Sequence, residues 1–136
     1  MPLPSSSKIL YVDDDSDDRY FMSLSLTETG TNADLVCASN GEDAIQYLNS
    51  IKTSELPSLI ILDLNMPKWD GTKTLNYLKK QPHLADIPVV ILTTSSNKAD
   101  LDKCTLMGAS SCFTKPYRFD DYKSIINSFG SFLGRS

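Results

Sequence analysis

The chain has 136 residues, of which 40% are hydrophobic and 22% are charged, a composition that suits one globular domain and argues against a chain that is disordered as a whole. Its 17 acidic residues outnumber its 13 basic ones and give a formal net charge of −4. This balance argues against nucleic acid as a partner, because phosphate binding needs a basic face. One histidine and three cysteines without a Cys-x-x-Cys pair argue against a zinc site, and Cys37, Cys104 and Cys112 are predicted to be reduced and mostly buried.

The first seven residues, MPLPSSS, are expected to form a loose leader, residues 1–7, before a single domain at residues 8–134 with no output domain. The start has no basic region followed by an apolar stretch, so it does not resemble a signal peptide. No apolar run approaches the length needed to span a membrane. We therefore expect a cytoplasmic protein with no membrane partner.

Apolar runs and helical spacings alternate along the rest of the chain. Strands are expected at Ile9–Val12, at Ala33–Ala38, within LPSLIILDL, within IPVVILTTSS and at Ser111–Thr114. Helices are expected at Ser16–Glu28, in SNGEDAIQYLNSI, through Leu75 and Leu78, at Asn97–Met107 and at Phe119–Leu133. Five strands alternating with five helices predict an α/β fold with a mostly parallel sheet and helices on both faces.

The ends of the first and last helices carry more specific expectations. Asp14–Ser16 can cap the first helix and Gly30 can end it, with Tyr20, Phe21, Leu24 and Leu26 near one side. Ser96 or Asn97 is expected to cap the fourth helix. In the last helix the apolar stripe comprises Tyr122, Ile125, Ile126, Phe129, Phe132 and Leu133.

Polar side chains gather where the predicted strands end. The first strand ends in Asp13, Asp14 and Asp15, the third in Asp63, the fourth in Thr93 and Thr94, and the fifth in Lys115. Ligand chemistry in open parallel sheets occurs at the carboxyl ends of the strands. Adjacent carboxylates recruit a hard cation such as Mg²⁺, a carboxylate can accept a phosphoryl group, and a hydroxyl and an ammonium can hold its oxygens. These residues therefore predict a phosphoryl site, and no Walker A sequence supports nucleotide binding.

Four segments in this order and spacing, LYVDDD, LIILDLNMPKWDG, VVILTTS and GASSCFTKPY, resemble the receiver domain of two-component response regulators over about Lys8 to Leu133. The resemblance implies a flavodoxin-like doubly wound (βα)5 fold with strand order 2-1-3-4-5. LDLNMPKWDG and PHLADIPVVILTTS are most similar to the stand-alone regulators that work with phytochrome-type histidine kinases.

The resemblance also implies a role for each site residue. Asp63 is the phosphoacceptor for a phosphoryl group from a sensor histidine kinase or phosphotransfer protein. Asp13 and Asp14 hold Mg²⁺ together with Asp63, and the backbone carbonyl of Asn65 is a further ligand. Thr93 is the hydroxyl that moves on phosphorylation. Lys115 pairs with the phosphoryl group or with Asp63, and its bond to Pro116 is expected to be cis.

Several structural readings stand beside these roles. Asp15, Asp17 and Asp18 are expected to be helix-start charges without an essential part in the site, and Asp70 and Gly71 to form a turn. Cys112 occupies the position where many receivers place Tyr or Phe. Its neighbour Phe113 points to the opposite face of a strand and cannot replace it, so the usual coupling of threonine to an aromatic ring is in question.

Two other functions remain open from the sequence alone. One is a small phosphatase with Asp13 as nucleophile and Asp15 as acid, and the other is a scaffold that binds partners without phosphorylation. For the receiver, output is expected through protein contacts, including a homodimer through the face formed by the fourth helix, the fifth strand and the fifth helix.

Overall fold

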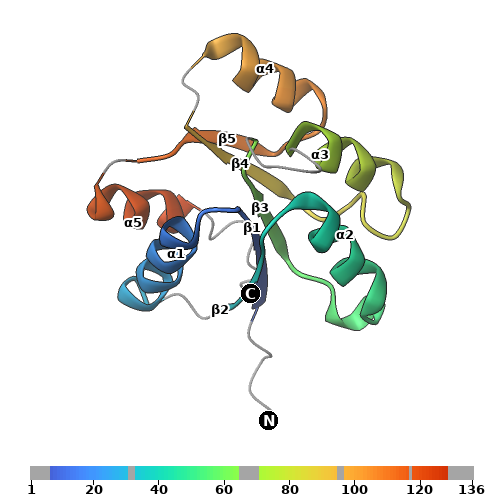
Figure 1. Ribbon diagram of the computed structural model, residues 1–136, viewed down its shortest axis with the longest axis horizontal. Coiled ribbons are helices and arrows are strands. Elements are labelled where there is room, and N and C mark those ends of the chain that lie inside the picture. Colours follow the sequence, from blue (N-terminus) through green and yellow to red (C-terminus); the bar gives the residue numbers. More distant parts are fainter. Residues whose placement is uncertain (1–6, 31–32, 65–70, 95–96, 117, 129–136) are drawn as a thin grey trace.

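The computed structural model describes residues 7–30, 33–64, 71–94, 97–116 and 118–128. These residues form a five-stranded sheet with helices on both sides (Figure 1). The strands are β1 Ser7–Val12, β2 Ala33–Ala38, β3 Leu59–Leu62, β4 Val89–Thr93 and β5 Ser111–Thr114. The helices are α1 Ser16–Glu28, α2 Gly41–Ser50, α3 Gly71–Lys80, α4 Lys98–Leu106 and α5 Phe119–Asn127, with a 3-10 turn η1 at Thr53–Glu55.

The sheet has the order β2-β1-β3-β4-β5, and every neighbouring pair of strands is parallel. The predicted flavodoxin-like topology is therefore confirmed. Val12 is paired with Leu62 in the β1–β3 register, so these two strands end side by side. Asp13 and Asp63 are the next residues of each strand, and their positions at the sheet edge follow from this register.

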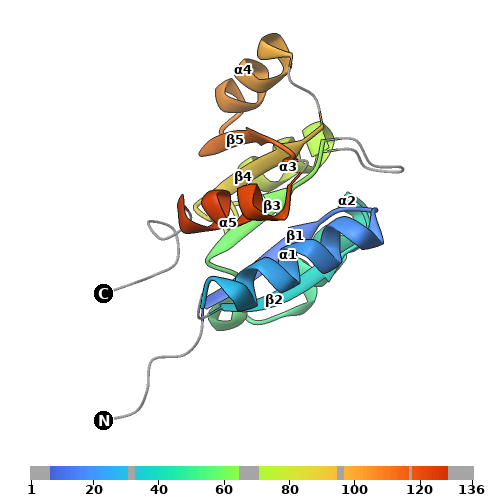
Figure 2. The ribbon, with the colours of Figure 1, turned by 90° about the vertical axis from the view of Figure 1, so that its left-hand side faces the viewer.

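The sheet separates two apolar layers. One layer lies under α2, α3 and α4, and the other lies under α1 and α5, which run side by side on the opposite face (Figures 1 and 2). Every residue of β3 and β4 is buried, as strands covered on both faces require. Burying one such large side chain contributes about 1.5–3 kcal/mol, so the two layers hold the strand ends in fixed positions.

The helix starts agree with the predicted caps. The side chain of Asp15 accepts hydrogen bonds from the backbone N–H groups of Asp17 and Asp18 at the start of α1. Asn97, rather than Ser96, caps α4 by accepting from the N–H of Ala99 at 2.8 Å. After α1 the chain turns at Gly30, whose φ of 68° lies in the left-handed region that favours glycine.

The inward side of α1 differs from the prediction. Tyr20 is 61% exposed and Phe21 is 40% exposed. Met22, Ser25 and Leu26 are the buried residues of this helix. The contacts with the sheet and with α5 set the rotation of the helix, and they override the aromatic spacing that the sequence suggested.

Two further predictions need comment. Cys104 is buried and Cys112 is partly buried, but Cys37 is exposed, so the prediction of mostly buried thiols is wrong for Cys37. Its strand, β2, lies at an edge of the sheet, where covering by neighbours is incomplete. The predicted leader, except Ser7, and the apolar residues Phe129, Phe132 and Leu133 lie outside the described residues. Among the described helices, none is both long and apolar enough to cross a bilayer.

Candidate functional site

The ends of β1 and β3 bring three carboxylates together. Asp13 is 0% exposed and Asp63 is 4% exposed, whereas Asp14 is open to solvent. One carboxylate oxygen from each of these three residues lies within 4.8 Å of the others. The backbone N–H of Asp63 donates to the carbonyl of Val12 at 3.0 Å, which continues the β1–β3 ladder into the site. The cluster is therefore part of the sheet edge and is placed by the core.

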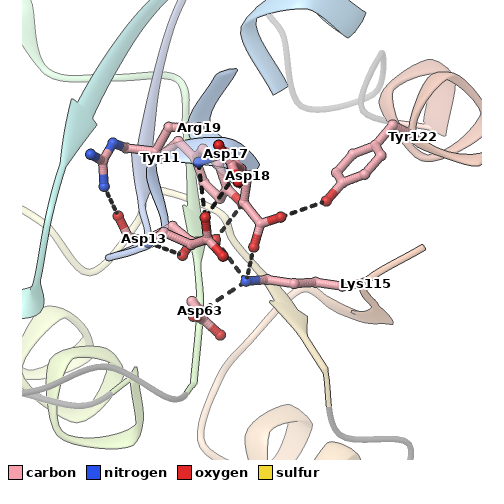
Figure 3. Close-up of polar contacts among 9 residues, drawn as sticks. Tyr11, Asp13, Asp17, Asp18, Arg19, Asp63, Lys115 and Tyr122 are labelled. Atoms are coloured by element: carbon pink, nitrogen blue, oxygen red, sulfur yellow. Dashed lines mark hydrogen bonds and ion pairs between the residues drawn. The ribbon is translucent and has the colours of Figure 1, made fainter. Parts of the chain in front are cut away.

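Asp13 is held from several sides (Figure 3). The Tyr11 hydroxyl donates to Oδ2 of Asp13 at 2.6 Å, and the N–H of Asp15 donates to Oδ1 at 2.9 Å. The Arg19 guanidinium donates to the backbone carbonyl of Asp13 at 2.6 Å. Burial, followed by the charge of Asp13, raises the pKa of Tyr11 far above its ordinary value. Tyr11 is thus a permanent neutral donor, and Asp13 keeps one orientation.

The Lys115 ammonium lies at the centre of the acidic groups, as Figure 3 shows. Its Nζ is 2.8 Å from Oδ2 of Asp13, 2.7 Å from Oδ2 of Asp18 and 3.4 Å from Oδ2 of Asp63. Burial alone lowers the pKa of Lys115, but the hydrogen bonds and charges of the carboxylates outweigh it and raise the pKa above its ordinary value. The lysine is therefore a fixed positive charge beside Asp63.

Asp18 is the residue that the sequence reasoning missed. It was expected to be a helix-start charge without an essential part, but its carboxylate pairs with Lys115 and accepts from the Tyr122 hydroxyl at 3.4 Å. Once Asp15 is recognised as the cap of α1, Asp18 is the third helical residue, in the first turn of the helix that follows β1. The cap at Asp15 could have indicated the position of Asp18 in the first turn of α1. The ion pair with Lys115, which follows β5, could not be predicted from the sequence.

The two neighbouring acids behave as expected. Asp17 is exposed, and its backbone N–H donates to Oδ1 of Asp15 at 2.8 Å. The carboxylate of Asp15 is engaged in capping α1. That engagement disfavours the phosphatase reading, in which Asp15 would be a free acid.

Thr93 occupies the end of β4 and is 0% exposed, whereas Thr94 is exposed. The backbone N–H of Lys115 donates to the carbonyl of Thr93, so the last residue of β4 is joined directly to the first residue after β5. Of the two candidate threonines, Thr93 is therefore the one built into the sheet edge. Asn65, the predicted carbonyl ligand, lies outside the described residues.

Gly71 supports the site from the start of α3. A Cβ atom at this position would lie 2.3 Å from the carbonyl oxygen of Asp63 and 2.6 Å from Cα of Leu64. The N–H of Gly71 donates to the carbonyl of Leu64 at 3.0 Å. Gly71 was expected to form a turn, but it is the first residue of α3, while Asp70 lies outside the described residues. The absence of a side chain lets α3 pack directly on the backbone of Asp63.

Cys112 and Phe113 face opposite sides of β5, as strand alternation requires. Cys112 packs against the layer under α2, α3 and α4, and Phe113 packs against the layer under α1 and α5. The Cys112 thiol donates to the carbonyl of Leu101 at 3.5 Å and lies 3.7 Å from Oγ1 of Thr105. The position that holds an aromatic ring in many receivers is therefore attached to α4 through a small thiol.

The Lys115–Pro116 bond corrects one expectation. It was expected to be cis, and the described residues, which include both Lys115 and Pro116, contain no cis peptide bond. The bond is trans, the form that X-Pro bonds favour by about 0.5–1 kcal/mol.

The donor set of the site suits a hard divalent cation. Carboxylate oxygens are the ligands that Mg²⁺, Mn²⁺ and Ca²⁺ prefer, and three of them converge here from Asp13, Asp14 and Asp63. A buried carboxylate next to a cation site and an ammonium can act as a nucleophile toward phosphorus, since both positive groups offset the charge of a phosphoryl group. The arrangement can therefore perform phosphoryl transfer to a carboxylate.

Comparison with known families identifies the chain. The model of the response regulator receiver domain matches residues 9–127, and the chain belongs to this family. It is a receiver-domain response regulator of two-component signalling, a class of phosphoacceptor signalling proteins.

Individual relatives support the expected likeness to phytochrome-associated regulators. Response regulator Rcp1 of Synechocystis sp. is 32% identical over 127 residues, which cover 91% of this chain and 86% of Rcp1. The phosphorylated cyanobacterial phytochrome response regulator RcpA has a TM-score of 0.83 and 30% identity over 94% of both chains. The Mn²⁺-bound form of Rcp1 has a TM-score of 0.81 and 31% identity over 96% of both chains.

Proposed function

We propose that Asp63 is the residue of this receiver that accepts the phosphoryl group, and that the donor is a phosphohistidine. The observation that carries the proposal is a buried carboxylate, 4% exposed, with Lys115 Nζ 3.4 Å from its oxygen and Asp13 and Asp14 beside it. An oxygen of Asp63 would form a bond to phosphorus as the phosphorus–nitrogen bond of the donor breaks. The imidazole would leave with the electron pair of that bond.

We propose Mg²⁺ as the cation of this site, held by Asp13, Asp14 and Asp63, with the carbonyl of Asn65 as a further ligand. The convergence of three carboxylates within 4.8 Å supports this assignment, and so does the Mn²⁺ found with the relative Rcp1. When bound, the cation offsets the negative charge of the carboxylates and of the phosphoryl oxygens. Asp14 is the exposed member of the set, so it is the ligand most accessible to an incoming ion.

We propose that Lys115 binds a phosphoryl oxygen on Asp63 and that the Thr93 hydroxyl moves toward the phosphoryl group. The ammonium is already within reach of Asp63, and its raised pKa keeps it charged. Movement of Thr93 would pass to β5 through the backbone bond between Lys115 and Thr93. Because Cys112 replaces the usual ring, the response of α4 would travel through the thiol contact with Leu101.

The proposed partner is a sensor histidine kinase of the phytochrome type or its phosphotransfer protein in the cytoplasm, with residues 8–134 acting as one receiver. The printed descriptions of Rcp1 and RcpA support this choice. Output is proposed to occur through protein contacts, including a homodimer through α4, β5 and α5. Leu106 at the end of α4 is 88% exposed, which suits such a contact. Sedimentation should then show dimers, and a monomer at high concentration with and without a phosphoryl analogue would contradict the dimer.

Intact mass after treatment with acetyl phosphate tests the central proposal. Wild type should gain one phosphoryl group in the presence of Mg²⁺ and none in the presence of a chelator. Asp63→Asn should gain none. Asp17→Asn should behave as wild type, because Asp17 is exposed and the ion pairs of Lys115 are with Asp13, Asp18 and Asp63. Phosphoryl addition that persists in Asp63→Asn would contradict the proposal, and a scaffold function or another nucleophile would then replace it.

A further inference from the structure

One ammonium in this site serves three carboxylates, and the three contacts are unequal. Lys115 Nζ lies 2.7 Å from Asp18 and 2.8 Å from Asp13, whereas its distance to Asp63 is 3.4 Å. The lysine side chain is 8% exposed, so water has little access to it. An ammonium has three donors, and in this state the two shorter contacts are to residues other than the proposed phosphoacceptor.

The carboxylate of Asp18 has a second contact in addition to Lys115. Its Oδ1 accepts from the hydroxyl of Tyr122 on α5, while its Oδ2 faces Lys115 (Figure 3). Its side chain is 20% exposed, in contrast to the exposed Asp17 of the same helical turn. Asp18 is therefore a positioned partner from α1 rather than a solvated helix charge.

Competition for Lys115 follows from this geometry. A phosphoryl oxygen on Asp63 must compete with Asp18 and Asp13 for the donors of the Lys115 ammonium, and the Asp18 carboxylate, 2.7 Å from Nζ, opposes a shift of the ammonium toward that oxygen. We propose that Asp18 is a positioning residue that holds Lys115 toward α1 and thereby weakens binding of a phosphoryl group at Asp63. This role rests on the proposed function of Asp63. By reciprocity, a phosphoryl group at Asp63 weakens the Lys115–Asp18 contact that joins α1 to β5.

If Asp18 has this role, Asp18→Asn should change Mg²⁺ binding and beryllofluoride binding in different directions. Asp18→Asn removes one negative charge near the acidic cluster, so Mg²⁺ alone should bind equally or more weakly. The same change releases Lys115, so beryllofluoride, a phosphoryl analogue, should bind about tenfold more tightly in saturating Mg²⁺. Loss of local structure would instead weaken the binding of both.

Titration calorimetry of Mg²⁺ and then of beryllofluoride, on wild type, Asp18→Asn and the charge-matched Asp17→Asn, tests the role. Asp17→Asn should change the beryllofluoride Kd by less than about twofold, because exposed charges are screened. An unchanged or weaker beryllofluoride Kd in Asp18→Asn, or equal tightening in Asp17→Asn, would overturn the role. If Asp18→Asn does not fold, Tyr122→Phe releases only Oδ1 of Asp18 and should tighten beryllofluoride by about twofold. An unchanged Kd in that variant would also overturn the role.

The wild-type data separate this role from the proposed function. If wild type bound no beryllofluoride, or if Asp63→Asn bound it as well as wild type, the assignment of Asp63 would be wrong and the role of Asp18 would be lost with it. If wild type bound beryllofluoride through Asp63 while Asp18→Asn did not respond, only the role of Asp18 would be wrong.

Discussion

A methyl group at Gly71 tests how closely α3 packs against Asp63, the proposed phosphoacceptor. In Gly71→Ala the new Cβ would lie 2.3 Å from the carbonyl oxygen of Asp63, 2.6 Å from Cα of Leu64 and 2.9 Å from the carbonyl carbon of Asp63. All three atoms belong to the backbone, so no side-chain rotation relieves the contact. Because non-bonded heavy atoms prefer separations of about 3.5 Å, either α3 or the end of β3 must move by about 1 Å.

The cost of this movement can be set from its parts. Overpacking in a well-packed region costs about 1–3 kcal/mol. Lengthening the bond from the N–H of Gly71 to the carbonyl of Leu64, now 3.0 Å, costs about 1 kcal/mol more. The better helix propensity of alanine offsets up to about 1 kcal/mol. The free energy of unfolding of Gly71→Ala should therefore fall by about 1–4 kcal/mol, as measured by urea unfolding. The Mg²⁺ affinity of this variant should also fall because Asp63 is displaced.

Gly30→Ala is the matched control. The added Cβ meets nothing within 4 Å, but φ is +68°, so its cost is backbone strain of about 1–2 kcal/mol. Gly30 lies after the end of α1, away from the carboxylates. The Mg²⁺ affinity of Gly30→Ala should therefore match that of wild type. A Gly71→Ala protein with wild-type stability and Mg²⁺ affinity would refute the close support of Asp63 by α3.

Three further predictions concern other parts of the molecule. Ser25 Oγ is buried without a hydrogen bond to the part of the chain that the structure describes. Ser25→Ala should therefore raise the free energy of unfolding by about 1 kcal/mol, as measured by urea unfolding. A loss of stability would instead show that the hydroxyl is bonded. Burial, then the charge of Asp18, raises the pKa of Tyr122 from 10.0 to about 12. The unfolded state loses this proton first, so stability should fall between pH 10 and 12, and Tyr122→Phe should fall less steeply; equal slopes would contradict the assignment. A thiol reagent should modify the exposed Cys37 before Cys104, which is 2% exposed, as followed by mass spectrometry. Burial raises the pKa of both thiols, so solvent access determines which reacts first. Early labelling of Cys104 would contradict its packing.

Much of the fold could be predicted because local and long-range preferences agree in this chain. The bounds of α1, β2 and β5 match the structure, since Asp15 fixes the start of α1 and apolar runs end at polar strand ends. The convergence of Asp13, Asp63 and Lys115 was also predictable, because the carboxyl ends of parallel strands share one edge of the sheet. The individual roles came from the family likeness and remain proposals.

Tertiary packing decided the features that the sequence could not give. The rotation of α1 leaves Tyr20 exposed and Phe21 partly exposed beside Tyr122, although their spacing with Leu24 and Leu26 suggested one common side. The same rotation brings Asp18 to Lys115, a contact between residues 97 positions apart in the chain. Neither result follows from a helical pattern alone, because the rotation of a helix is set by the surface that it covers.

The cluster of carboxylates at the ends of β1 and β3 also couples cation binding to folding. Asp13, Asp14, Asp18 and Asp63 are held near one another by the core, while Lys115 is the ammonium that pairs with Asp13, Asp18 and Asp63. Like charges held at short range oppose folding, so these carboxylates lower the stability of the chain at the proposed phosphoryl site. An ion that binds only the folded chain returns stability according to its concentration. The melting temperature of this receiver should therefore rise with the concentration of divalent cation, and the size of the rise should report the affinity of the folded chain for the ion.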